Sequence, residues 1–192
     1  MEQAILREHN YILEYKNIRL RPTLEEDFKL ISKWGSDSEV LYYSEGDDVR
    51  QPYSVDDVKE IYKTAPNAFC FIIEYENKPI GECWLQKNNI QYLIDDYPDI
   101  DSRRIDITIG EKDYWGKGIG TIAVRLLTQF GFEVDNADMI FYLPYDYNVR
   151  SCKTAERVGY KLLSKTEEKY SPKAKFCYNY GMTREDYFAG KG

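Results

Sequence analysis

The sequence predicts an α/β fold built on one mixed sheet, because strand-like and helix-like segments alternate along the chain. Residues 17–22 alternate between apolar and polar side chains, as expected of a half-buried strand. The segment 119–130 instead carries its apolar side chains at helical spacing. No repeat or linker interrupts the pattern, so we expect one domain over 1–192, with an N-terminal extension at 1–16 and a C-terminal tail at 183–192.

The first half of the chain predicts two helices and a hairpin after its first strand. Thr23 and Glu26 form a capping-box pattern that opens the first helix. Ser54 opens the second, and an acidic, aromatic loop at 42–53 is expected between them. Two apolar runs joined by "ENKP" predict a hairpin over 68–86.

The second half predicts a further series of strands and helices. A polar, aspartate-rich segment at 88–104 precedes a strand at 105–110, and a glycine-rich turn then opens a helix. The remaining elements are expected as strand, helix, strand and strand at 139–144, 148–159, 160–170 and 175–182.

Charge and cysteine content limit the classes of partner. The formal net charge of -7 argues against nucleic acid, which requires a basic face, and favours a cationic partner. The four cysteines form no CxxC pair and His9 is the only histidine, so no metal site is expected. The longest apolar run, 68–73, is too short to span a bilayer, and the N-terminus resembles no signal peptide. We therefore expect a cytoplasmic protein, a monomer or homodimer, that contacts neither membrane nor nucleic acid.

The stretch "WGKGIGT", residues 115–121, is the clearest local motif. A glycine-rich turn that opens a helix presents unpaired backbone N–H groups at the positive end of the helix dipole, which suits an anion. The order of Gly116, Gly118 and Gly120 matches neither a P-loop nor a dinucleotide-binding fingerprint. Two alternatives remain at this point, a phosphate site and a tight strand-to-helix turn.

The stretch "DYWGKGIGT" resembles the acetyl-CoA pyrophosphate loop of the GNAT acetyltransferases, and "NVRSCKTAERVGY" resembles the helix that lines the coenzyme A arm in that family. The resemblance implies a GNAT fold, with a mixed, mostly antiparallel sheet, a splayed acetyl-CoA-binding strand and helices on both faces. It also implies acetyl-CoA as the cofactor. The residues it assigns to the cofactor are the backbone amides of Lys117, Gly118, Ile119, Gly120 and Thr121 for the pyrophosphate, and Ile107, Ile109 and Asn148 for the pantetheine arm.

Within the family, residues 97–121 look most like aminoglycoside 6'-N-acetyltransferases. The resemblance places Asp106 at the strand aspartate that contacts the acceptor amine and acts as its base. Strand alternation sets Asp106 on the face opposite the isoleucines of this strand. The alternative is a carboxylate that only pairs with Arg103 or Arg104.

Acidic residues near this strand suit a polycationic acceptor, such as an aminoglycoside. The alternative for each of them is a solvated acidic loop. The candidates are Asp95, Asp96, Asp99 and Asp101 before the strand, Glu45, Asp47 and Asp48 in the loop between the first helices, and Asp146.

Other features bear on the mechanism. Many GNAT enzymes place a tyrosine seven residues after the helix asparagine as the acid for the leaving thiolate, but Ala155 stands there. The proton would then come from Tyr147 or water, or the thiolate would leave without an acid. No cysteine is placed for a covalent intermediate, so we expect direct attack in a ternary complex, with a backbone N–H near Ile107 facing the oxyanion.

Two other functions remain open. Residues 153–160 and 180–188 also resemble ribosomal-protein N-terminal acetyltransferases. A GNAT-like module that binds acetyl-CoA without turnover is the other alternative.

Overall fold

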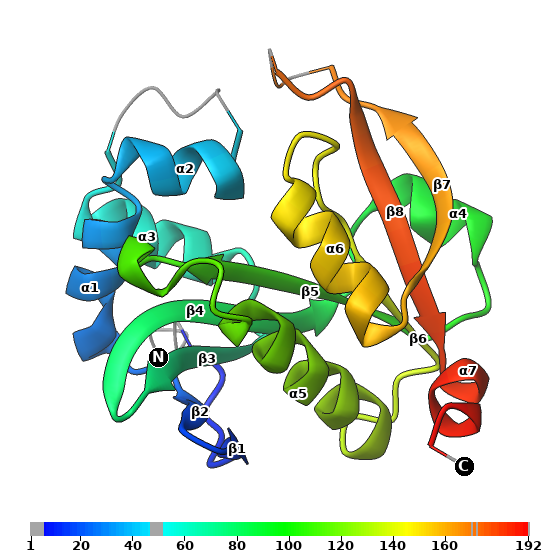
Figure 1. Cartoon of the computed structure of the whole chain (residues 1–192), viewed down its shortest axis with the longest axis horizontal. Coiled ribbons are helices and arrows are strands. Elements are labelled where there is room, and N and C mark those ends of the chain that lie inside the picture. Colours follow the sequence, from blue (N-terminus) through cyan, green and yellow to red (C-terminus); the bar gives the residue numbers. More distant parts are fainter. Residues whose placement is uncertain (1–5, 47–51, 170, 172, 192) are drawn as a thin grey trace.

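Eight strands form one sheet, in the order β1-β2-β3-β4-β5-β6-β8-β7 (Figure 1). The computed structural model describes residues 6–46, 52–169, 171 and 173–191. Every neighbouring pair of strands is antiparallel except β5 and β6, which are parallel. The strands are β1 Leu13–Tyr15, β2 Ile18–Pro22, β3 Phe69–Tyr75, β4 Lys78–Lys87, β5 Ser102–Ile109, β6 Met139–Tyr142, β7 Lys161–Glu167 and β8 Phe176–Thr183.

Helices cover both faces of the sheet, as predicted. Strand β3 shows why, because Phe71 packs into the cluster that holds α5, whereas the next residue, Ile72, packs into the cluster that holds α1 and α3. The helices are α1 Phe28–Trp34, α2 Ser38–Ser44, α3 Val55–Lys63, α4 Gln91–Asp96, α5 Ile119–Glu133, α6 Val149–Val158 and α7 Arg184–Ala189, with 3-10 turns at Glu25–Asp27 and Lys112–Tyr114. No helix in the described ranges is long and apolar enough to cross a membrane.

The sheet opens between β5 and β6. Their parallel pairing runs from Ser102 with Met139 to Ile105 with Tyr142 and then stops. Strand β5 continues for four more residues, Asp106–Ile109, which remain paired with β4 on the other edge. Among the described residues, no strand lies beside the other edge of this segment, which confirms the predicted splayed strand.

The first helix begins differently from the prediction. Thr23 does not cap it, because its hydroxyl is buried and has no hydrogen-bond partner among the described residues. Asp27 accepts a 2.9 Å hydrogen bond from the Leu24 N–H, and the Arg21 guanidinium holds the same carboxylate at 2.7 Å. Arg21 on β2 thus pairs with Asp27, and a 3-10 turn at Glu25–Asp27 precedes α1. The second predicted helix does open at Ser54, which forms a capping box with Asp57 at the start of α3.

Two short helices, α2 and α4, were not predicted from the sequence: α2 ends inside the predicted loop at 42–53, and α4 lies in the predicted polar segment at 88–104. The Asp37 carboxylate accepts hydrogen bonds from the N–H groups of Glu39 and Val40 and so caps α2. Helix α4 buries Leu93 against β6. Each helix has only one or two buried residues, so its apolar periodicity is weak.

Candidate functional site

Two clefts meet where β5 separates from β6. The larger, of about 700 Å³, lies between α2, α3 and the carboxyl halves of the central strands, and we call it the acidic cleft. The smaller, of about 350 Å³, lies between the glycine turn and α6, and we call it the basic cleft. Ligands in the two clefts can touch each other, because eight residues line both: Val40, Tyr43, Ser44, Ile107, Thr108, Tyr142, Asn148 and Ser151.

The glycine turn forms one wall of the basic cleft. Gly116 and Gly118 have φ of +74° and +79°, a region that residues with a Cβ rarely adopt. Gly118 is the N-cap of α5, and the first helical hydrogen bond runs from the Ile122 N–H to its carbonyl at 3.2 Å. The N–H groups of residues 119–121 therefore have no acceptor within the helix and suit an anion in this cleft.

Cationic side chains of α6 form the opposite wall. Arg150, Lys153 and Arg157 line the basic cleft, and none of its described lining residues is acidic. The Arg150 guanidinium lies 4.4 Å from the centre of the Tyr43 ring and 4.3 Å from that of Trp115. The sequence analysis missed this row. Its spacing of three and four residues along one helix is a signal that could have revealed it.

Most of the residues predicted to bind the cofactor line the basic cleft. They are Ile107, Ile109, Gly118, Ile119, Gly120, Thr121 and Asn148. Lys117 is not part of the lining, and its ammonium group lies 5.0 Å from the centre of the Tyr114 ring.

Asn148 holds two helices beside both clefts. Its side-chain oxygen caps α6 by accepting a 3.1 Å hydrogen bond from the Ser151 N–H. Its side-chain amide donates to the Tyr43 carbonyl of α2 at 3.0 Å. The neighbouring Tyr147 hydroxyl donates to the Tyr42 carbonyl at 2.5 Å. Residues 147 and 148 thus anchor the C-terminal end of α2 over the splay.

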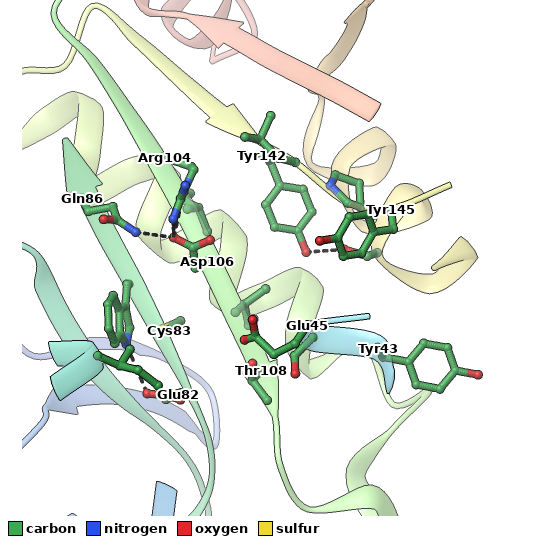
Figure 2. A pocket seen from close by; sticks show the side chains of 18 of the residues that line it. Tyr43, Glu45, Glu82, Cys83, Gln86, Arg104, Asp106, Thr108, Tyr142 and Tyr145 are labelled. Carbon is green, nitrogen blue, oxygen red and sulfur yellow. Dashed lines mark hydrogen bonds and ion pairs between the residues drawn. The ribbon is translucent and has the colours of Figure 1, made fainter. Parts of the chain in front are cut away.

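Asp106 projects into the acidic cleft from β5, with its side chain 45% exposed (Figure 2). Its Oδ2 atom accepts hydrogen bonds from the Gln86 amide at 2.6 Å and from the Arg104 guanidinium at 3.0 Å. The ion pair that the sequence left open as an alternative is therefore present, with Arg104. Arg103 points elsewhere and binds Asp101 and Asp135. Asp106 is both ion-paired and accessible from the cleft.

Glu82 is a second carboxyl group of the acidic cleft, and the sequence analysis missed it. Its Oε2 atom accepts a 2.5 Å hydrogen bond from the Tyr62 hydroxyl and a 3.1 Å bond from the Trp84 indole N–H. Burial raises the pKa of Glu82 against the opposing effect of these two hydrogen bonds, and the charges of Glu45 and Asp106 raise it further. It lies on an apolar hairpin strand, where nothing local distinguishes it from a solvated glutamate.

Glu45 enters the same cleft from the end of α2, as predicted from its acidic segment. Loss of bulk water around its carboxyl group raises the pKa of Glu45, the Asp106 charge raises it further, and Arg104 opposes the shift. Three of the carboxyl groups that line this cleft thus come from three elements, and the charge of Asp106 raises the pKa of the other two, Glu45 and Glu82.

The other acidic candidates that the structure describes lie outside both clefts. Asp95 and Asp101 are exposed and bound locally, by the Gln91 amide at 2.8 Å and by Arg103 at 2.6 Å. The Asp146 carboxylate accepts from the Lys175 N–H at 3.2 Å. Asp96 and Asp99 are also exposed, whereas Asp47 and Asp48 lie outside the described residues. Residues that precede these aspartates line the acidic cleft instead, namely Asn89, Ile90 and Tyr92.

Known proteins share this architecture. An acetyltransferase from the GNAT family of Bacillus anthracis aligns with a TM-score of 0.71 and 16% identity, over 91% of this chain and 99% of that one. The aminoglycoside acetyltransferase AAC(6')-Ib, in complex with ribostamycin and coenzyme A, aligns with a TM-score of 0.76 and 20% identity, over 92% of this chain and 99% of that one. Its complex with coenzyme A and kanamycin aligns with a TM-score of 0.73 and 19% identity, over 91% and 99% of the two chains.

The family model described as the acetyltransferase (GNAT) domain matches residues 17–161. That range runs from the first long strand through the open edge of β5 and the glycine turn to the end of α6. The chain belongs to the GNAT acetyltransferase family.

Proposed function

We propose that this protein transfers the acetyl group of acetyl-CoA to a primary amine of a small polycationic acceptor, such as an aminoglycoside. One observation carries the proposal: a basic cleft at a glycine turn opens directly into an acidic cleft, and the two meet at an unpaired strand edge. An anionic acyl donor and a cationic acceptor could meet there without sharing a binding surface.

The basic cleft suits coenzyme A in charge and in backbone geometry. The free N–H groups at the start of α5 would bind the pyrophosphate, and the α6 cations would add electrostatic attraction. The open edge of β5 at Ile107 and Ile109 would bind the pantetheine arm as an added strand. Arg150, which packs on the rings of both Tyr43 and Trp115, would close this cleft over the arm.

The acidic cleft suits an acceptor with several ammonium groups. Glu45 and Asp106 face it from different elements, and Glu82 lies deeper on β4. Aromatic rings complete its walls, and the neighbouring AAC(6')-Ib structures hold aminoglycosides such as ribostamycin and kanamycin. An ammonium group must lose a proton before its nitrogen can attack a thioester.

Asp106 would accept that proton. Gln86 and Arg104 both bind Oδ2, so they fix the carboxylate and leave Oδ1 as the oxygen nearer to an incoming amine. The backbone N–H of Ile107, on the same strand at the splay, would face the carbonyl oxygen on which negative charge develops. Attack would then be direct, within a ternary complex.

The test is release of coenzyme A from acetyl-CoA in the presence of kanamycin-type aminoglycosides, polyamines or ribosomal N-terminal peptides. We expect turnover with an aminoglycoside and a loss of at least about 100-fold in kcat for Asp106→Asn. Asp101→Asn is the matched control, since Asp101 is another arginine-paired carboxylate that lies outside the clefts. Turnover with peptides alone would assign the N-terminal acetyltransferase function, and tight acetyl-CoA binding without turnover would assign a binding module.

A further inference from the structure

We infer that the Tyr142 hydroxyl, oriented by Ser151, donates the hydrogen bond that stabilises the departing thiolate of coenzyme A. The inference rests on the proposed function. It addresses the position on α6 where Ala155 stands in place of the tyrosine that serves this purpose in many GNAT enzymes.

The position of Tyr142 carries the inference. It is the last residue of β6 paired with β5, so its ring lies where the two strands begin to separate. Both Tyr142 and Ser151 line the basic and the acidic cleft, where the donor and acceptor would react. In Figure 2 the Tyr142 side chain lies between Asp106 and Tyr145.

The partner on α6 connects this hydroxyl to the replaced position. Ser151 lies four residues before Ala155 and so shares its face of the helix. The Ser151 Oγ atom lies 2.7 Å from the Tyr142 hydroxyl. Ala155 is fully buried and offers no donor. The Tyr142 hydroxyl, which comes from the sheet, thus reaches the face of α6 on which Ala155 offers no hydroxyl.

Tyr147, the other candidate donor, is positioned elsewhere. Its hydroxyl donates to the Tyr42 carbonyl of α2, and Tyr147 lines neither cleft. Cys152, beside Ser151, is no donor of this kind, because its thiol donates to the Tyr145 carbonyl at 3.7 Å and Cys152 lines neither cleft.

The ionisation of Tyr142 suits a hydrogen-bond donor. Burial raises the pKa of Tyr142 to about 12, opposed by the Ser151 hydrogen bond and assisted by the negative charge of Asp106. The phenol therefore keeps its proton at neutral pH. A thiol is a stronger acid than this phenol, with a pKa of about 8.5 for a cysteine side chain, so a thiolate is too weak a base to remove that proton. Tyr142 would donate a hydrogen bond to sulfur without transferring the proton.

The bonds and charges of the step balance. The acceptor ammonium gives one proton to Asp106, and the resulting amine forms the new C–N bond. The nitrogen then releases a second proton to water as the tetrahedral intermediate collapses to the amide. The C–S bond breaks, and its electron pair stays on sulfur. Coenzyme A leaves as a thiolate that accepts the Tyr142 hydrogen bond and takes its proton from water after release.

The first experiment needs no acceptor. Coenzyme A bound to the protein is titrated with pH while the thiolate absorbance is recorded in the ultraviolet. We expect the parent protein to hold the pKa of the bound thiol below that of free coenzyme A. Tyr142→Phe should raise it by about one, a tenfold change in the acid constant. Tyr160→Phe is the matched control, since its buried hydroxyl lies 2.8 Å from the Thr128 hydroxyl, and Tyr160 lies outside both clefts.

A second variant separates the two hydroxyl groups. Ser151→Ala should move the pKa of the bound thiol in the same direction by less than Tyr142→Phe, because Tyr142 loses orientation but keeps its proton. Equal thiol pKa values in the parent protein and Tyr142→Phe would overturn the inference. A full effect in Ser151→Ala with none in Tyr142→Phe would also overturn it, by making Ser151 the donor.

Turnover gives an independent readout. With the best acceptor, Tyr142→Phe should lower kcat by about 10- to 100-fold and leave the KM for acetyl-CoA nearly unchanged. If Tyr142→Phe instead raised the KM for acetyl-CoA by about 10- to 100-fold and left kcat unchanged, a role in the departure of the thiolate would be contradicted. If the parent protein turns over no acceptor, the proposed function fails, and the thiol titration still decides the role of Tyr142.

Discussion

At the scale of single residues, the glycines of the turn serve different purposes. Gly118 needs its left-handed conformation, whereas Gly120 lies inside α5 with an ordinary helical backbone. A Cβ on Gly120 would meet only the Ile107 Cδ1 atom, at 3.9 Å. The fold therefore does not require glycine at position 120. A ligand that approaches the backbone closely there would require it.

This difference gives opposite effects on stability and binding. We expect Gly120→Ala to stabilise the protein by about 0.4–1 kcal/mol, because alanine restricts the unfolded chain. It should weaken coenzyme A binding by about tenfold, because the methyl group faces the proposed phosphate position. Thermal unfolding and calorimetric titration measure the two effects. Unchanged affinity would contradict the proposed phosphate site.

Gly131→Ala provides a contrast in the same helix. Its Cβ would lie 2.6 Å from the Ile140 Cδ1 atom in the core, so this variant should lose about 1–3 kcal/mol of stability. Its folded fraction should bind coenzyme A as the parent protein does, since Gly131 is remote from the basic cleft.

The buried carboxyl of Glu82 should make stability depend on pH. Because burial raises its folded pKa above the ordinary value of 4.5, Glu82 opposes folding progressively as pH rises from 4.5 through the folded pKa. Glu82→Gln keeps an acceptor oxygen for Tyr62 and Trp84 and removes this penalty. At pH 8 the Tm of the variant should exceed that of the parent protein by about 2–4 °C for each kcal/mol gained in the free energy of unfolding. The difference in Tm should be smaller at pH 5. An equal difference at both pH values would contradict this account.

At the scale of elements, α2 and α6 form one unit around the splay. The N-terminal end of α6 and the preceding tyrosine hold the carbonyl groups of Tyr42 and Tyr43. Through them, α2 places Glu45 in the acidic cleft and Tyr43 against Arg150 in the basic one. Neither helix end is positioned by its own sequence alone.

Hydrogen exchange should distinguish the anchoring of α2 by Tyr147 and Asn148 from the capping of α6 by Asn148. Tyr147→Phe removes the bond to the Tyr42 carbonyl, so the amides at the C-terminal end of α2 should exchange faster while those of α6 stay protected. Asn148→Ala removes both the α6 cap and the bond to Tyr43, at a cost of about 1 kcal/mol, so both helices should exchange faster. Unchanged protection of α2 in both variants would show that these bonds do not hold it.

At the scale of the whole molecule, charge is separated between the two clefts. The chain carries a formal net charge of -7, yet the basic cleft has three cations from α6 and no acidic residue among its described lining. The acidic cleft gathers Glu45, Glu82 and Asp106 a short distance away, across the residues that line both. Net charge by itself predicted a cationic partner and gave no sign of the basic cleft.

Salt should therefore weaken binding of the acyl donor through local charges rather than through net charge. The KM for acetyl-CoA should rise between about 0.05 and 0.5 M salt, and Lys153→Gln should make this rise less steep. Lys161→Gln makes the same change in net charge but removes a lysine that pairs with Asp186 outside the clefts. If both variants alter the salt dependence equally, net charge accounts for the effect.

The sequence alone predicted much that depends on local patterns. Alternation and helical spacing located the hairpin of β3 and β4, the strand β5 and the long helix α5. Seven of the eight residues that the family resemblance assigned to the cofactor line the basic cleft. The sequence could not predict α2 and α4, because each helix has too few buried residues to show helical periodicity of its apolar side chains.

Tertiary structure decided which polar residues share a cleft. Glu82 and Asp106 lie 24 positions apart, and they face the same cleft because β4 and β5 pair antiparallel with Glu82 opposite Thr108. The aspartates at 95–101 are closer to Asp106 in sequence, but their segment runs along exposed surface and Arg103 retains Asp101 there. Proximity along the chain predicts proximity in space only within one element. Across elements it is set by strand register and by the burial of long-range ion pairs, which one sequence does not display.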